Sequence, residues 1–137
     1  MKRFLLISLS LILFHACSRG DSNSVDYSLE LLPVESVDMP ESFIRGETYS
    51  ITVTYFKPSS CYTFKEFYYL KENNENTIAV INYKYVDNNC IILDDKLVDA
   101  TFNFEVTDNE RCIFKFWKGV NDHDEDLYLT MEVPVIN

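Results

Sequence analysis

Four cysteines, Cys17, Cys61, Cys90 and Cys112, are the residues whose chemistry most constrains this 137-residue chain. A thiol can act as a nucleophile, bind a metal, form a disulfide or carry a covalent modification. Nucleophilic catalysis needs a neighbouring base, and His123, the histidine outside the N-terminal apolar run, lies in an acidic segment that suits this role poorly. Zinc sites use close pairs such as C-x₂-C, which this sequence lacks. The cysteines therefore predict neither a catalytic centre nor a metal centre.

Residues 1–16 have the features of a secretory signal peptide. Lys2 and Arg3 form a short positive segment, and an apolar run follows from Phe4 to Phe14. The run has the length of a signal-peptide apolar region and is too short to span a bilayer as a helix. A buried N-terminal strand or helix is the alternative, but it leaves the basic start and the abrupt polar end unexplained.

Ala16 and Cys17 follow the apolar run and resemble the lipobox of bacterial lipoproteins, where a cysteine after a small residue is lipidated and becomes the new N-terminus. Phe14 and His15 depart from the leucine and the small residue that usually precede this pair. The resemblance implies that Cys17 carries lipid, which would hold the protein to a membrane. Residues 17–26, with small and polar residues after the cysteine, are expected to form a flexible tether.

Ser18, the residue after Cys17, is of the kind that permits transfer to the outer membrane in such lipoproteins. The resemblance therefore implies a cell-envelope location, on the periplasmic or the surface face. Removing residues 1–16 takes Lys2 and Arg3 from the 12 basic residues and none of the 22 acidic ones, so the net charge moves from −10 to −12. Nucleic acids and anionic membrane surfaces attract clustered basic residues, so the acidity argues against both as partners.

In an oxidising compartment, Cys61, Cys90 and Cys112 could form one disulfide and leave one free thiol. Cys61 and Cys90 each lie beside a turn signal, where the backbone geometry is adaptable. Cys112 alternates with Phe114 and Phe116, which favours a buried thiol. The preferred pairing is therefore Cys61–Cys90, which closes a loop of about 30 residues. Cys61–Cys112, the pairing nearest to that of an immunoglobulin-like domain, stays open as an alternative.

From about Tyr27 onward, the sequence has mainly the period of β-strands. The segment from Tyr49 to Tyr55 alternates without interruption, and β-branched and aromatic residues are frequent in such segments. Turn signals divide the domain, residues 27–137, into about seven strands. The expected strands are 27–37, 48–57, 62–71, 77–86, 99–107, 111–118 and 126–135. Their number and spacing predict an all-β fold, specifically an antiparallel, immunoglobulin-like β-sandwich.

Two segments add detail to this expectation. Residues 60–72 also fit helical spacing, although their tyrosine and phenylalanine content favours a strand. Pro134 interrupts the last strand. Because proline has no N–H to donate, the last strand is expected to lie at a sheet edge or to change partner near its end.

The densest acidic stretch contains Asp122, Asp124 and Asp126, which are spaced like the first ligands of a calcium loop. Leu127 and Val133 occupy the positions where the helix–loop–helix motif needs Gly and Glu, so that motif is absent. A looser calcium site is the alternative to a solvated hairpin loop. We expect no cofactor.

Aromatic residues are too numerous for a single core face. Trp117 is expected to face away from Phe114 and Phe116, and Trp117, Tyr68 and Tyr83 form the candidate binding surface. Packing at sheet edges and under loops is the other explanation for these rings. The sequence lacks the motifs of serine hydrolases, phosphate-binding loops, zinc proteases and dinucleotide sites, so we predict no enzymatic activity.

The basic start, the apolar run, the Ala16–Cys17 pair, the tether and the strand-like segments together resemble small, acidic lipoproteins of Gram-negative bacteria with one immunoglobulin-like sandwich. The resemblance implies a non-enzymatic, envelope-anchored binding or interaction module. Its partner would be another envelope protein or an external ligand. The alternative is a carbohydrate-binding or accessory component of an outer-membrane glycan-uptake system.

Overall fold

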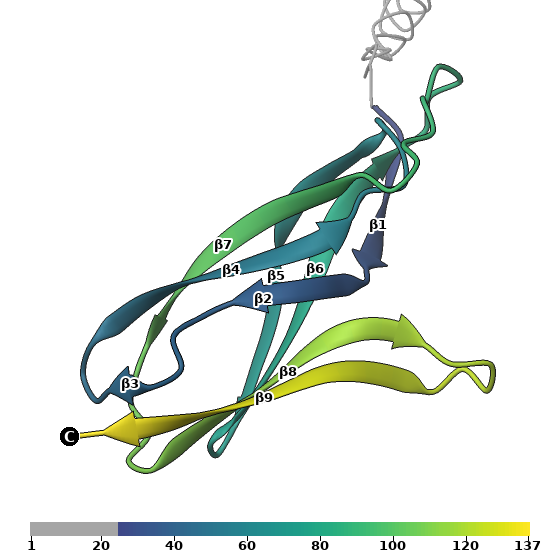
Figure 1. Ribbon diagram of the computed structural model, residues 1–137. Coiled ribbons are helices and arrows are strands. Elements are labelled where there is room, and N and C mark those ends of the chain that lie inside the picture. Colours follow the sequence, from purple (N-terminus) through teal and green to yellow (C-terminus); the bar gives the residue numbers. More distant parts are fainter. Residues whose placement is uncertain (1–24) are drawn as a thin grey trace, which may run out of the picture.

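A computed structural model describes residues 25–137, and this part of the chain is built of β-strands (Figure 1). The strands are β1 (Tyr27–Leu32), β2 (Val34–Asp38), β3 (Phe43–Ile44), β4 (Thr48–Phe56), β5 (Tyr62–Glu72), β6 (Glu75–Tyr85), β7 (Leu97–Glu105), β8 (Arg111–Val120) and β9 (Asp126–Ile136). Over these residues no helix is long and apolar enough to cross a membrane. The predicted signal peptide and Cys17 lie outside the described residues.

The strands form two sheets that share one core. The larger sheet has the order β1-β6-β8-β9-β3, and β5 pairs with the other edge of β6. The smaller sheet has the order β2-β4-β7. Side chains from both sheets meet in a single hydrophobic core, in which Phe43, Phe114 and Phe116 are the largest fully buried residues. The all-β prediction is confirmed.

The chain contains nine strands between residues 25 and 137, so the prediction of about seven is wrong. The segment 27–37 was expected as one strand, but it is divided at Pro33. Leu32 is the last residue that pairs with β6, and Val34 is the first that pairs with β4 in the other sheet. The change of sheet occurs at Pro33, whose carbonyl oxygen accepts the Phe56 N–H of β4 at 3.5 Å. The two-residue strand β3 was missed because so short a segment has no visible period.

The larger sheet is mixed, which corrects the expectation of an antiparallel arrangement. β6 pairs in parallel with β8 from Glu75↔Ile113 to Ile78↔Phe116, and β3 pairs in parallel with the end of β9. These pairings join distant segments, and alternation along one strand does not reveal the direction of its neighbour. The smaller sheet is antiparallel throughout.

Alternation within the strands follows the sequence prediction. Ile51 and Val53 of β4 and Phe114 and Phe116 of β8 are completely buried. Full burial of such a side chain contributes about 1.5–3 kcal/mol relative to leaving it exposed. Residues 62–72 form the strand β5 and not a helix.

Pro134 lies near the C-terminal end of β9, at the edge of the larger sheet. One edge of β9 pairs with β8, while its other edge meets only β3, through Val135 and Ile136. Over the described residues β9 is therefore an edge strand until it gains a second neighbour at its end. An edge position suits Pro134, because the missing N–H of proline then leaves no ladder acceptor without a partner.

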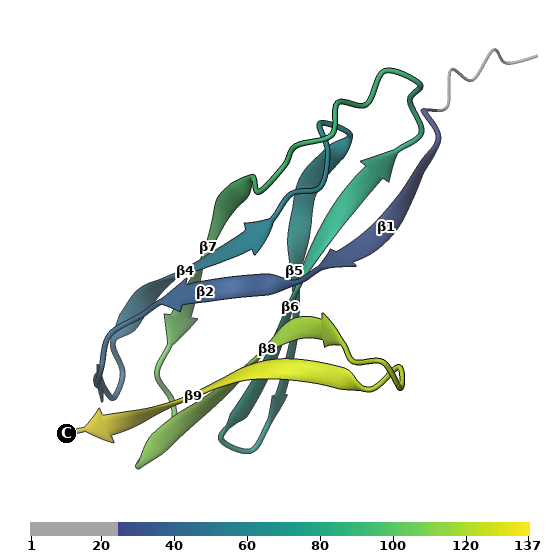
Figure 2. The same ribbon diagram turned by 45° about the vertical axis from the view of Figure 1, so that its right-hand side comes forward.

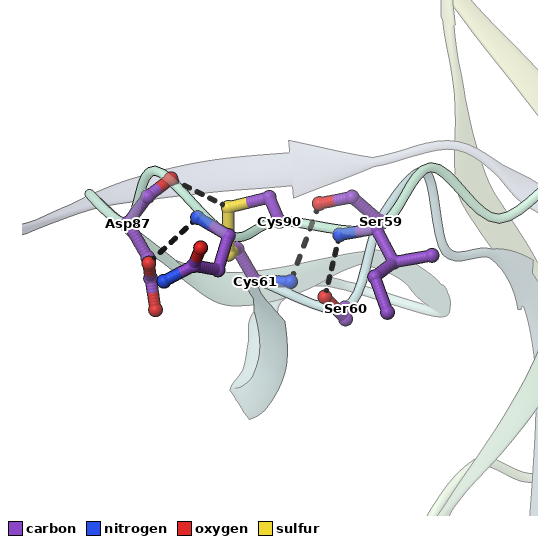
Figure 3. The surroundings of a disulfide bond; sticks show 7 residues. Ser59, Ser60, Cys61, Asp87 and Cys90 are labelled. Carbon is purple, nitrogen blue, oxygen red and sulfur yellow. Dashed lines mark hydrogen bonds between the residues drawn. A yellow bond between two sulfur atoms is a disulfide. The ribbon is translucent and has the colours of Figure 1, made fainter.

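Cys61 and Cys90 form a disulfide with their Cα atoms 5.4 Å apart, which confirms the preferred pairing. Cys112 is free and completely buried, so the Cys61–Cys112 alternative is wrong. Figure 3 shows the bond beside Ser60, whose N–H donates to the Ile91 carbonyl oxygen while its Oγ accepts the Ile91 N–H, both at 2.9 Å. The disulfide and these hydrogen bonds fasten the long β6–β7 loop to the start of β5.

Replacing both Cys61 and Cys90 by serine should lower the free energy of unfolding by about 3–4 kcal/mol, because the cross-link restricts the unfolded chain. Urea unfolding followed by Trp117 fluorescence measures this change. Cys112→Ala keeps the cross-link and is the matched control, with an expected cost of about 1 kcal/mol. An unchanged stability in the double variant would contradict a structural role for the disulfide.

Candidate binding site

A seam runs across the outer face of the larger sheet where two strands share one edge of β6. β8 pairs with β6 as far as Ile78, and β1 pairs with β6 from Val80 onward, so Ala79 has no partner on that edge. Figures 1 and 2 show β1 and β8 leaving β6 in different directions. On the opposite edge of β6, Tyr68 of β5 lies across from Ala79.

A hollow of about 450 Å³ lies over this seam. We call it the outer hollow, and define it by side chains from five strands that line it: Leu31, Tyr68, Leu70, Thr77, Ala79, Trp117 and Tyr128. Thr77 and Ala79 are small and come from the central strand, whereas the larger side chains come from the strands on both sides. Because side chains alternate across a strand, Ile78 and Val80 between and beside them face the core. The hollow thus opens over Thr77 and Ala79, the small outward residues of β6, and Ile81 bounds it farther along the same strand.

Hydrogen bonds and charge contacts position the aromatic rings of the outer hollow. The Nε1–H of Trp117 donates to Oδ1 of Asp126 at 2.8 Å. The Nζ of Lys115 lies 4.6 Å from the ring centroid of Tyr128 and 3.3 Å from Oε1 of Glu75. A cation over an aromatic ring is attracted by its negative face. These contacts tie together the side chains of β6, β8 and β9 that surround the hollow.

The three aromatic residues selected from the sequence do not form one continuous surface. Trp117 and Tyr68 both line the outer hollow. Tyr83 lies on the same face but farther along β6, with its ring centroid 4.9 Å from Tyr27 and 5.9 Å from Tyr85. The structure therefore brings two of the three residues together and places the third in an adjoining tyrosine cluster.

Several residues of the outer hollow were not predicted from the sequence. Tyr128 could have been found, because its neighbour Leu129 packs against the core and alternation then turns Tyr128 outward. Leu31 could not, because its position depends on where β1 leaves β6. Leu70 was assigned to a strand but not to a face, and it pairs with Thr77 beside the hollow.

Carboxylates lie beside the apolar walls of the hollow. Asp126 is bonded to Trp117, Glu75 is paired with Lys115, and Glu72 is exposed on β5. An arrangement of aromatic faces next to hydrogen-bond acceptors can bind a ligand that has both apolar surface and donor groups. No nucleophile–base pair is needed for such binding.

The three aspartates of the calcium candidate lie in two different elements. Asp122 and Asp124 lie in the β8–β9 loop, whereas Asp126 begins β9 and accepts the Trp117 hydrogen bond. Within residues 25–137, no group of three or more His, Cys, Asp or Glu side chains is arranged to hold a metal ion.

Asn121 gives the β8–β9 loop its shape. Its Oδ1 accepts hydrogen bonds from the backbone N–H of His123 at 2.8 Å and of Glu125 at 3.0 Å. Asp124 adopts a positive φ of 59°, which the tight turn requires. Such side-chain-to-backbone bonds are typical of Asn in turns.

Cys112 is the free thiol of the described chain, and it lies in the core and not in the outer hollow. Burial raises the pKa of this thiol to about 12, and its hydrogen bond to Asp108 acts in the same direction. The thiolate is the reactive form of cysteine. Cys112 is therefore an unreactive core residue at neutral pH.

Comparisons with models of protein families, with curated proteins and with solved structures found no match for this chain.

Proposed function

We propose that this chain is a non-enzymatic, envelope-anchored lipoprotein whose folded domain is a binding or interaction module. The outer hollow is its binding site, and an envelope protein or an external ligand is its partner. The observation that carries this proposal is the meeting of Trp117 and Tyr68, from different strands, in one hollow of about 450 Å³. Pockets that bind ligands combine apolar and aromatic walls with a few placed polar groups.

The fold part of the proposal is a β-sandwich of the immunoglobulin-like kind. Two sheets around one core support the sandwich. A first segment shared between the two sheets, β1 in one and β2 in the other, supports the comparison with immunoglobulin-like domains. The parallel β6–β8 pairing departs from the antiparallel pattern of those domains.

The anchoring part of the proposal rests on Cys17 and on the signal-like segment before it. Lipid on Cys17 would attach the domain to the envelope, in the outer membrane, through the short tether. A net charge of −12 after removal of residues 1–16 (10 basic against 22 acidic residues) suits a domain that stays off an anionic surface.

Cys17→Ser should abolish incorporation of radiolabelled palmitate in bacterial cells that express the full chain. Fractionation should then find the variant detached from membranes. Cys112→Ala is the matched control and should be labelled like the wild type, because its thiol is buried. Full labelling of Cys17→Ser would reject the lipid anchor while leaving the proposed binding site untouched.

A carbohydrate-binding function, as an accessory to glycan uptake, is the second candidate. The observation that favours it is the arrangement of Trp117, Tyr68 and Tyr128 beside the carboxylates of Glu72 and Asp126. Aromatic rings offer flat apolar faces to a sugar ring, and carboxylates accept hydrogen bonds from its hydroxyl groups.

The binding site can be tested by placing a photoreactive amino acid at position 72, on the rim of the outer hollow. We expect irradiation of cells to cross-link a defined partner, which mass spectrometry identifies. Trp117→Ala should reduce this cross-linking at least tenfold, because loss of a central aromatic residue typically costs 2 kcal/mol or more of binding. Ile92→Ala, which truncates an exposed apolar residue of the β6–β7 loop, should leave the yield unchanged.

Cross-linking and glycan titration together distinguish the two candidate functions. A protein cross-linked in a Trp117-dependent manner supports an envelope-protein partner. For glycans, the purified chain is titrated with the members of a glycan array, and Trp117, the only tryptophan, reports binding through its fluorescence. A cross-link that survives Trp117→Ala unchanged would exclude the outer hollow as the protein-binding site, and an array with no response would exclude the carbohydrate candidate.

A further inference from the structure

β7 has one free edge in the described part of the chain. Along its whole length it pairs with β4, and no strand between residues 25 and 137 pairs with its other edge. The edge carries neither proline nor lysine from Leu97 to Glu105, and its pairing with β4 has no register shift. Proline, lysine and β-bulges commonly protect an edge strand from pairing with another chain, and this edge of β7 has none of the three.

The hydrogen bonds at both ends of β7 show which backbone groups are free. The Lys57 N–H donates to the Lys96 carbonyl at 2.9 Å, and the Val106 N–H donates to the Glu47 carbonyl at 3.0 Å. Residues of an antiparallel pair alternate between bonding to the neighbour and facing away from it. Even-numbered residues of β7 therefore bond to β4.

The odd-numbered residues of β7 direct their N–H and C=O groups toward the free edge. Asp99, Thr101, Asn103 and Glu105 all belong to this set, and their side chains are exposed on the outer surface of the smaller sheet. The edge thus presents a regular row of donors and acceptors beside a row of polar side chains.

An apolar groove of about 430 Å³ lies between β7 and the facing edge strand of the larger sheet, β5. We call it the interlayer groove, and its apolar lining consists of Phe67, Tyr69, Ile78, Phe102 and Phe104. The inward side chains of a strand added to β7 would point into this groove, because inward and outward positions alternate.

Two contacts bound the interlayer groove, one between β5 and β7 and one between β5 and the β7–β8 loop. The rings of Phe67 and Phe102 meet with their centroids 5.0 Å apart. The Nζ of Lys71, which also lines the groove, donates to Thr107 at 3.0 Å and to Asp108 at 2.9 Å. The groove is therefore a defined space that a few side chains can fill.

The charges around the free edge favour a basic occupant. Within the described residues, both lysines of β5 are engaged, Lys65 by Glu66 and Lys71 by Asp108. Glu105 lines the interlayer groove, is exposed and belongs to none of the ion pairs found there. An approaching segment with Lys or Arg would meet complementary charge.

We propose that the free edge of β7 accepts an extended segment of a partner protein as an added β-strand. Apolar residues at alternate positions of that segment fill the interlayer groove. Lys or Arg residues at the intervening positions lie beside Asp99 and Glu105 on the outer surface. Main-chain hydrogen bonds give such strand addition its affinity, and the groove gives it specificity. This site lies apart from the outer hollow and goes beyond the proposed binding function.

The test uses a synthetic peptide of nine residues, the length of β7, in which lysine alternates with valine or phenylalanine. Titration of the full chain in detergent, followed by the anisotropy of a dye on the peptide, should show saturable binding. Hydrogen–deuterium exchange should show that the peptide protects the amides of Thr101, Asn103 and Glu105. A scrambled peptide and a peptide with glutamate in place of lysine should not bind.

Two variants locate the interaction on β7. Asn103→Pro removes one outward N–H without breaking a bond to β4, a change that edge strands tolerate, and it should abolish peptide binding. Glu105→Lys keeps the backbone intact and should weaken binding roughly fivefold by charge repulsion. Glu35→Lys makes the same charge change on β2, the other edge strand of the smaller sheet, and should have no effect.

The outcomes decide the proposal even if Asn103→Pro fails to fold. Equal binding by Glu105→Lys and Glu35→Lys would overturn it, as would binding without protection of the β7 amides or no binding at all. Full protection of those amides before peptide is added would mean that another segment or copy of this chain already holds the edge, which would also overturn it. Unchanged peptide binding by Trp117→Ala would separate this site from the outer hollow.

Discussion

The division of one edge of β6 between two strands is the constraint on which the rest of the structure depends. β1 leaves β6 after Leu32 and the chain continues as β2 in the other sheet, where the Pro33 carbonyl oxygen accepts the Phe56 N–H of β4. The part of the edge that β1 does not reach pairs with β8 in parallel, from Glu75 to Ile78. The chain thus changes sheet at Pro33, next to the place where the larger sheet becomes mixed.

Buried polar contacts keep this junction in place. Asn76 is completely buried at the start of the parallel pair, and its Nδ2 donates to the Ile113 carbonyl oxygen at 3.2 Å. Its Oδ1 accepts a hydrogen bond from the hydroxyl group of Tyr69 on β5. A buried amide without partners would cost about 1–3 kcal/mol, so these bonds favour one register for β5, β6 and β8. The outer hollow opens over Ala79, farther along β6 from Asn76.

Short sequence patterns predicted the strand faces and the disulfide, whereas the sheet topology depends on pairing between distant segments. Alternation gave the faces of β4 and β8, and nearby turns gave the Cys61–Cys90 pairing, because both depend on a few neighbouring residues. Pro33 could have predicted the break between β1 and β2, because proline seldom occurs inside a paired strand, but segment 27–37 was expected as one strand. The parallel partner of β6 was not legible, since a strand's period says nothing about its neighbour. Trp117 and Tyr68 were chosen as exposed aromatic residues, but only the seam explains why they meet and why Tyr83 does not join them.

The central claim is that small outward side chains on β6 create a binding site at the seam. Ala79→Phe tests it most directly, because the new ring would fill the floor of the outer hollow and leave the core untouched. The measurement is the cross-linking yield from position 72 in cells, with urea unfolding as the check on folding. The account predicts a stable protein that no longer cross-links its partner. A stable Ala79→Phe protein with the full cross-linking yield would contradict it.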